Sequence, residues 1–379
     1  MRFFHISDLH LGKRLCEYSL MPDQEYILAR ILDAVECEHP DALIVAGDVY
    51  DKAVPSAEAV ALFDSFICAL ASKNVPTFVI SGNHDSPERI AFGSSIMGTS
   101  GIYMSPVFDG QIKPIRLCDE HGDVFVYLLP FIKPAHVRHA YPDEKCDSYT
   151  DALAAVISHM SVDTSARNVL VTHQFVTGAT RSESEEISVG GSDNVDASVF
   201  DRFDYVALGH IHGPQSVTRK SVRYCGTPLK YSFSEANHEK SITCVTLGGK
   251  GAVSVDTIPL APMRDLREIR GEFDVITSPA YYENTAREDY LHITLTDEDD
   301  IPEALTRLRA VYPNLMKLDY DNTRTRTENT LTVSSAIEKR SPLELFCDFF
   351  EMQNGQMPDQ TQREYLTSLI EKIWEVEGK

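Results

Sequence analysis

The chain has 379 residues, of which 43% are hydrophobic, and its formal net charge is −22. Because this length exceeds what one hydrophobic core usually supports, we expect a large domain and one or two smaller units. The negative charge argues against binding of a nucleic acid unless bound divalent cations or a second subunit supply positive charge. The eight cysteines include no CxxC pair, which excludes a zinc–thiolate knuckle and favours reduced, buried thiols.

Short β-rich runs alternate with helical periodicity through the first two-thirds of the chain. One helix is predicted at 24–38, with Asp23 as its N-cap, and a second at 56–71, directly after Pro55. This alternation predicts a layered α/β domain of αββα type, with functional loops at the carboxyl ends of its strands. The strands are predicted at 2–6, 42–46, 77–80, 124–129, 168–172, 205–208, 242–247 and 253–258.

The segment at 259–263 contains two prolines, which interrupt helix and sheet alike, so we interpret it as a linker. A smaller α+β unit is predicted beyond it, with strands at 291–295 and 315–319 and a helix at 302–310. We recognise no signal peptide and no run of about eighteen apolar residues, so we expect a soluble protein of the cytoplasm.

From Ser341 the pattern becomes helical again, with amphipathic helices predicted at 342–351 and 360–376. Two such helices forming a hairpin cannot bury their apolar faces alone, so we expect another surface to cover them. The apolar side chains concerned are Leu343, Leu345, Phe346, Phe349, Phe350, Leu366, Leu369, Ile370 and Ile373. We therefore divide the chain into a sandwich domain at 1–262, a capping α+β domain at 263–335 and a helical hairpin at 336–379.

Five of the predicted strands are followed by polar clusters that can ligate metal ions. The clusters are Asp8-Leu9-His10, Gly47-Asp48, Asn83-His84-Asp85, Thr172-His173-Gln174 and Gly209-His210-Ile211-His212. Asp8 and His10 are two positions apart in an extended stretch, so both side chains can reach one ion. Imidazoles mixed with carboxylates suit manganese, iron or zinc better than calcium, and Asp48 can bridge two ions. Two metals about 3.5–4 Å apart can activate water for phosphoester hydrolysis.

Each cluster alone has an ordinary structural explanation. A Gly-Asp pair after a strand is usually a turn, and His173 could be a core histidine with satisfied hydrogen bonds. A whole series of ligand-type residues, each directly after a β-like run, is poorly explained by unrelated capping residues. The sequence therefore predicts a dinuclear metal centre. Its ligands are Asp8, His10, Asp48, Asn83, His173, His210 and His212.

The order of these motifs resembles the calcineurin-like metallophosphoesterases, and within them the nuclease subunits of bacterial double-strand-break repair complexes. The resemblance spans essentially the whole chain, including the closing helical hairpin. It is carried by DLH, GD, GNHD, a lone histidine and GHIH in that order. The matching segments are 5–12, 46–51, 81–89, 191–196, 208–213 and 224–228.

The resemblance implies a role for each matched residue. It implies that the ions are held by Asp8, His10 and His212 and by Asn83, His173 and His210, with Asp48 as the bridge. His84 is then not a ligand; it lies beside the scissile phosphate and donates a proton or positive charge, while Asp85 orients its imidazole. Many relatives have a histidine three positions after the bridging aspartate, where this chain has Asp51, and we assign Asp51 no catalytic role.

The resemblance also implies a dimetal-dependent DNA nuclease subunit of DNA repair, recombination and replication. It would act as a 3′→5′ exonuclease on duplex ends and as an endonuclease at hairpins, with manganese as the expected cofactor. The implied partners are DNA, an SMC-like coiled-coil ATPase docked on 341–379, and a second copy of the chain that pairs through helices near the N-terminus. Much of the basic DNA-binding surface then belongs to the ATPase, which answers the objection from charge.

Other functions fit part of the pattern. A phosphatase or a small-molecule or cyclic-nucleotide phosphodiesterase would use the same ligands, but it has no need of the apolar helix pair. A binding scaffold with vestigial metal sites is opposed by the filled ligand positions. Arg89, and Lys13 with Arg14, could contact DNA phosphates or form surface ion pairs. The charged run at 180–186 is interpreted as a solvated loop.

Overall fold

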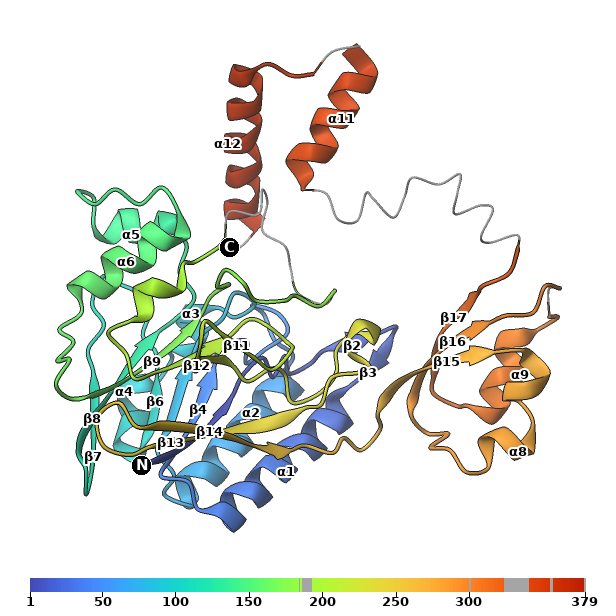
Figure 1. The fold of residues 1–379 in the computed structure, drawn as a ribbon, viewed down its shortest axis with the longest axis horizontal. Coiled ribbons are helices and arrows are strands. Elements are labelled where there is room, and N and C mark those ends of the chain that lie inside the picture. The colour runs from blue at the N-terminus through green and yellow to red at the C-terminus, as the bar shows by residue number, and fades with distance from the viewer. Residues whose placement is uncertain (184, 186–192, 300, 324–340, 355–356, 378–379) are drawn as a thin grey trace.

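In this computed structural model, the chain is described over residues 1–183, 185, 193–299, 301–323, 341–354 and 357–377. Two six-stranded sheets are stacked, and helices cover both outer faces (Figure 1). In spatial order the first sheet contains β14 (Val253–Pro259), β13 (Ser241–Leu247), β1 (Arg2–Ile6), β4 (Ala42–Ala46), β5 (Thr77–Ile80) and β6 (Ile102–Met104). The second contains β11 (Gln215–Val217), β12 (Arg219–Tyr224), β10 (Tyr205–Gly209), β9 (Arg167–His173), β8 (Gly122–Leu129) and β7 (Ile115–Asp119). The predicted αββα sandwich is confirmed.

The two sheets have the same internal plan. In the first sheet β1, β4, β5 and β6 run parallel, and in the second β12, β10, β9 and β8 do. Antiparallel strands extend one edge of the first sheet and both edges of the second. Because parallel strands share one carboxyl edge, the polar residues that follow β1, β4, β5, β9 and β10 come together at one end of the sandwich.

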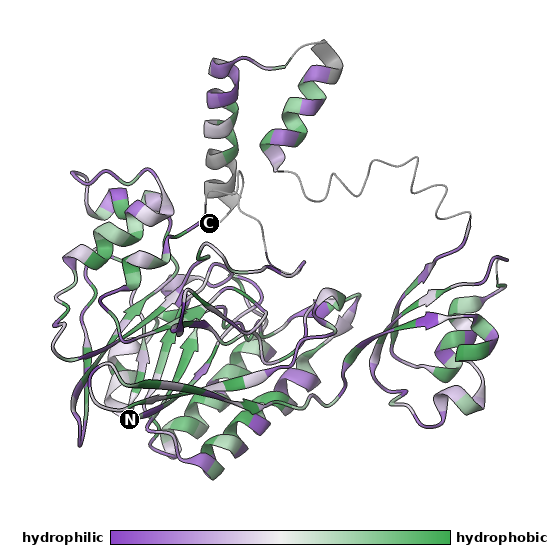
Figure 2. Cartoon of the chain, viewed as in Figure 1, coloured by the Kyte–Doolittle hydropathy of each residue, from purple (hydrophilic) through white to green (hydrophobic). Residues whose placement is uncertain are grey.

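Side chains along the central strands alternate between two apolar environments. On β4, Ile44 packs between the sheets, whereas Val45 packs under the helices. On β10, Ala207 faces the other sheet and Leu208 faces the helices. Both faces are buried, so these strands are continuously apolar, as Figure 2 shows.

The first sheet is covered by α1 (Met21–Glu38) and α2 (Ala57–Ser72), and the second by α5 (Pro134–Ala140) and α6 (Tyr149–His159). The short elements are β2 (Arg14–Leu15), β3 (Tyr18–Ser19), α3 (Pro87–Ile90), α4 (Ser94–Met97), η1 (Gly98–Ser100), η3 (Ala197–Phe200) and η4 (Phe233–Glu235). The prediction that Asp23 caps the first helix is wrong, because α1 begins at Met21 with Leu20 as its N-cap residue. Pro22 in the first turn favours this earlier start.

A small α+β unit follows the sandwich and has its own apolar core. It contains β15 (Leu266–Gly271), β16 (Tyr290–Leu295), β17 (Leu315–Tyr320), α7 (Phe273–Ile276), α8 (Pro279–Tyr282) and α9 (Ala304–Val311). Asp23 of the sandwich accepts hydrogen bonds from Arg264 at 2.8 Å and from Tyr290 at 2.7 Å. The charge of Asp23 therefore joins the two units instead of capping α1.

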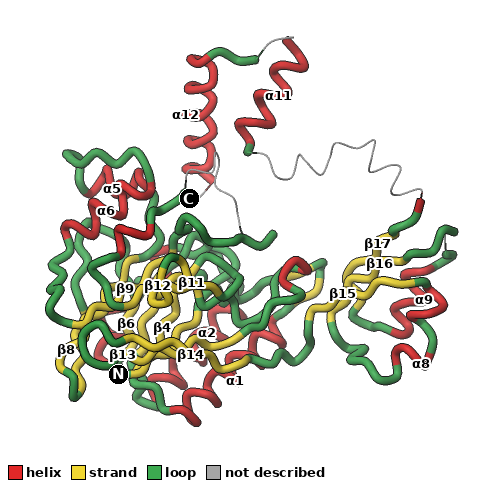
Figure 3. Tube along the Cα trace, in the orientation of Figure 1, coloured by secondary structure: helices red, strands yellow, loops and turns green. Residues whose placement is uncertain are grey.

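The closing hairpin contains α11 (Pro342–Asn354) and α12 (Gln360–Glu377), which contact each other (Figure 3). Phe346, Phe349 and Leu369 are exposed, as expected for a surface that another molecule covers. The side chain of Ile373 and the domain boundary predicted between 335 and 336 lie outside the described residues.

The cysteines differ in part from expectation. All eight are free, but Cys16, Cys37, Cys68 and Cys118 are exposed, so only half are buried thiols. Of the helices in the described ranges, none has the length and hydropathy that crossing a bilayer requires.

Candidate metal centre

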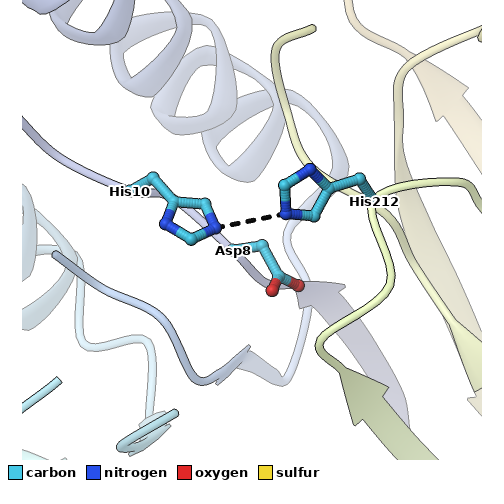
Figure 4. Close-up of side chains that lie close together, drawn as sticks. All are labelled: Asp8, His10 and His212. Atoms are coloured by element: carbon cyan, nitrogen blue, oxygen red, sulfur yellow. Dashed lines mark hydrogen bonds between the residues drawn. The ribbon is translucent and has the colours of Figure 1, made fainter. Parts of the chain in front are cut away.

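The first group of predicted ligands lies where the loops after β1 and β10 meet. Asp8, His10 and His212 are buried, and their ligating atoms lie within 4.8 Å of one another (Figure 4). Nε2 of His10 is 3.2 Å from Nε2 of His212. Two imidazole nitrogens at this distance repel each other as lone pairs unless a proton or a cation lies between them. The group is therefore suited to a divalent ion.

The second group meets beside the first. Oδ1 of Asn83 is 3.1 Å from Nε2 of His173 and 2.9 Å from Nδ1 of His210. Oδ2 of Asp48 lies between the groups, 3.3 Å from Nε2 of His173 and 3.7 Å from Nε2 of His10. Such spacings match ligand atoms that share one ion through bonds of about 2.0–2.2 Å. The structure thus brings all the predicted ligands to one site, with Asp48 in the middle.

Unusual backbone conformations build this site. Asp8, His10 and Asp48 have φ angles of 52°, 43° and 48°. This left-handed region costs an L-residue about 1 kcal/mol or more, and such strain concentrates at functional sites. Main-chain hydrogen bonds of 3.0 Å from the amides of Asp8 and His10 to Gly47 and Asp48 hold the two loops together.

Gly209 permits a close approach between the two sheets. A Cβ at this position would lie 1.9 Å from the carbonyl oxygen of Ala46 and 2.6 Å from Nδ1 of His173. That nitrogen lies 2.8 Å from the same Ala46 oxygen, to which its N–H donates. Any side chain on Gly209 would therefore displace His173 or separate the strands.

Burial governs protonation in the site. It lowers the pKa of His10 and of His210 well below the usual value, so both imidazoles are neutral and keep a lone pair for an ion. Burial also opposes the charge of His173, but the Asp48 carboxylate outweighs it and raises the pKa of His173 to about 9. Despite its own burial, Asp48 has a pKa well below the usual value because of His173. An ion that binds here displaces the His173 proton.

His84 lies at the rim, with a side chain that is 20% exposed and Nε2 4.0 Å from Oδ2 of Asp48. Its Nδ1 is 3.1 Å from the main-chain carbonyl oxygen of Asp51. Asp85 was expected to orient this imidazole, but its carboxylate is engaged by main-chain amides. These belong to Val49, Tyr50 and Gly82, at 3.0, 2.9 and 2.9 Å. Asp85 therefore ties the loops after β4 and β5 together, and Asp51 supplies the contact to His84.

His84 could also serve as a ligand, because it forms a possible metal-binding group with His10 and Asp48. Its assignment as a non-ligand stays a prediction. Asp51 has a larger part than the sequence suggested. Its carboxylate pairs with Lys13 at 2.8 Å and lies 3.9 Å from Nδ1 of His10, a buried atom without a hydrogen-bond partner in the described part of the chain. Lys13 thus forms an ion pair at the rim of the centre.

Sequence reasoning missed three buried charged residues around His212. Oε1 of Glu235 is 3.1 Å from Nδ1 of His212, and Nζ of Lys240 is 2.6 Å from the other oxygen of Glu235. Glu185 accepts a hydrogen bond of 2.5 Å from the amide of His212. Because Glu185 is only 7% exposed, the interpretation of 180–186 as a solvated loop is wrong at this residue. The local sequence gives no signal, since SEANHEK reads as a surface segment.

Comparison with known families agrees with this geometry. The model of the calcineurin-like phosphoesterases matches residues 1–214, and a model described as the type 5 capsule protein repressor C-terminal domain matches residues 262–354. The fold and the site are those of a calcineurin-like phosphoesterase. The chain is 32% identical over 386 residues to SbcD, the D-type subunit of the SbcCD nuclease, of Staphylococcus epidermidis, and the alignment covers 100% of both chains. It therefore belongs to the SbcD family of calcineurin-like phosphoesterases.

Solved structures also resemble the sandwich. TT1561 of Thermus thermophilus is 12% identical, and a dimetal phosphatase from Danio rerio is 13% identical. Each alignment covers 69% of this chain and 99% of the solved chain, with a TM-score of 0.40.

Proposed function

We propose that the chain is the nuclease subunit of an SbcCD-type complex and that it hydrolyses phosphodiester bonds of DNA with two divalent metal ions. The observation that carries this proposal is the convergence of carboxylate, imidazole and amide ligands from both sheets at one end of the sandwich. Full-length similarity to a nuclease subunit supports DNA as the substrate.

The ligands divide into two sets that share Asp48. Asp8, His10 and His212 hold one ion, Asn83, His173 and His210 hold the other, and Asp48 contacts both. When bound, the ions supply Lewis acidity toward the scissile phosphate and activate water for attack. Neutral His10 and His210 and the amide of Asn83 limit the negative charge that the protein adds, which favours the approach of a phosphate.

His84 completes the proposed site as a general acid or a positive charge beside the scissile phosphate. The carbonyl oxygen of Asp51 accepts from Nδ1 of His84, so Nε2 faces the centre and can carry a transferable proton. Asp85 acts on this step only through the loops that carry Asp48 and His84.

Manganese is the proposed ion, because four imidazoles combined with carboxylates and an amide suit a transition metal of this kind. With it the chain would work as a 3′→5′ duplex exonuclease and a hairpin endonuclease in DNA repair, recombination and replication. The SbcC-type coiled-coil ATPase is the proposed partner of α11 and α12, where Phe346 and Phe349 are exposed. Phe92 and Ile96, 81% and 77% exposed, support a homodimer contact around α4.

The direct test is Mn²⁺-dependent cleavage of end-labelled duplex and hairpin DNA, with and without the co-expressed ATPase. The wild-type chain is compared with His84→Gln and Asp48→Ala. Cleavage that both substitutions abolish would place the nuclease at this site. Absence of DNA cleavage together with rapid hydrolysis of bis-p-nitrophenyl phosphate would instead indicate a small-molecule phosphodiesterase, and absence of both would indicate a scaffold.

A further inference from the structure

The side chain of His212 is held from behind by a buried network. Nε2 of His212 faces the metal centre, whereas Nδ1 lies 3.1 Å from Oε1 of Glu235. Glu235 is 0% exposed and ends η4, a segment that none of the ligand motifs includes. Since an ionised carboxylate can only accept, Nδ1 carries the proton and Nε2 keeps its lone pair for an ion.

Lys240 makes this buried carboxylate tolerable. Its Nζ donates to Oε2 of Glu235 at 2.6 Å, to Oγ1 of Thr227 at 2.6 Å and to the carbonyl oxygen of His212 at 3.0 Å. These three bonds use all three donors of an ammonium group. Glu235 and Lys240 therefore form a compensated ion pair in a place where either charge alone would be costly.

We propose that Glu235 and Lys240 are positioning residues for metal binding: Glu235 fixes the tautomer and orientation of His212, and Lys240 keeps Glu235 ionised and in place. Carboxylate partners of this kind orient metal-binding histidines and raise their basicity. Lys240 acts on His212 at two points, through Glu235 and through the His212 carbonyl oxygen. The inference rests on the proposed dimetal centre and deepens it.

A purely structural ion pair is the competing explanation, and the two make different predictions. Replacing both members of a buried ion pair with neutral groups of similar size often leaves fold stability unchanged or raises it. A positioning role is not restored in this way, because the double variant still lacks the carboxylate charge behind His212. The double variant Glu235→Gln/Lys240→Met therefore separates the two roles.

The experiment uses the full chain, freed of metal by chelation, and titrates it with Mn²⁺ by isothermal calorimetry. Unfolding temperature is measured in parallel with EDTA. We expect Glu235→Gln and the double variant to bind one of the two ions about 10–100-fold more weakly, the usual effect of removing such a partner. We expect the double variant to unfold in EDTA at the temperature of the wild-type chain or above it.

Asp204→Asn is the matched control. Asp204 is a carboxylate with a side chain 5% exposed that pairs with Lys250 at 2.7 Å, but it precedes β10, whereas the metal centre follows β10. This variant should change unfolding and leave both Mn²⁺ affinities as in the wild-type chain.

Wild-type Mn²⁺ affinities in the double variant would overturn the positioning role, and so would an equal loss of affinity in Asp204→Asn. A wild-type chain that binds fewer than two ions would instead refute the dimetal centre itself, so the two failures can be told apart.

Discussion

The two halves of the metal centre are supported by different parts of the chain. Around His10 and His212 the supporting groups are side chains, with Glu235 on one imidazole and Asp51 3.9 Å from the other. Around His173 the support is main chain, because its Nδ1 donates to the carbonyl oxygen of Ala46. A side chain can be exchanged without moving a strand, whereas a main-chain contact cannot. The first half should therefore respond to substitution in ion affinity, and the second in fold stability.

Asp48 belongs to both halves, so its removal gives the largest effect. Asp48→Asn keeps the shape of the side chain but removes the charge that faces His173 and His10. We expect loss of at least one ion and of all DNA cleavage. Metal content by elemental analysis, together with a cleavage assay, checks this. Full metal content with normal cleavage would show that the two halves do not share this residue.

His84 belongs to neither half in the proposed assignment. His84→Gln should lower kcat by about 10²–10⁴-fold, the range for a general acid, while both ions remain bound. Single-turnover cleavage and Mn²⁺ calorimetry on the same preparation measure the two quantities. Weaker ion binding in this variant would make His84 a ligand, in agreement with its grouping with His10 and Asp48.

Gly209 tests the half that main-chain contacts support. Gly209→Ala places a Cβ 1.9 Å from the carbonyl oxygen of Ala46, so we expect the free energy of unfolding to fall by at least the ~1–3 kcal/mol typical of overpacking. Urea unfolding in EDTA measures this without any contribution from ions. Gly249→Ala is the control, since a Cβ there meets nothing within 4 Å. Equal stability of the two variants would contradict the close approach of the sheets at Gly209.

Asp51 tests the half that side chains support, with the smallest expected effect. Asp51→Asn leaves Lys13 and Nδ1 of His10 without their nearby negative charge. We expect Mn²⁺ affinity to fall about 10-fold, the lower end for a group that acts through a ligand, with little change in unfolding. Asp33→Asn, which removes an exposed ion pair with Arg30, should change neither quantity. If the two variants behaved alike, the carboxylate of Asp51 would have no part in the centre.

The sequence was sufficient wherever function depends on strand ends. Strands such as β4 and β5 are short, apolar on both faces and followed at once by polar residues, so their ends could be placed within a residue or two. Once parallel order is assumed, Asp48 and Asn83 have to meet. The same logic gave His173 and His210.

The sequence was insufficient where a role depends on contacts between distant segments. Glu235 and Glu185 lie in polar runs that resemble surface loops, and only the folded chain shows that both contact His212. Asp85 was assigned by its neighbour in sequence, whereas its carboxylate reaches amides after β4. Asp23 has the composition of a cap, but its partners are Arg264 and Tyr290, more than two hundred positions away.

The origin of the ligands has a consequence for how the protein comes apart. Asp8, His10, Asp48 and Asn83 follow strands of the first sheet, and His173, His210 and His212 come from the second. Each proposed ion is therefore a cross-link between two sheets whose other contacts are mainly apolar packing. In kinetic terms, the sheets of the loaded enzyme cannot separate until ligand bonds break, so metal supply would set the lifetime of the folded chain as well as its activity.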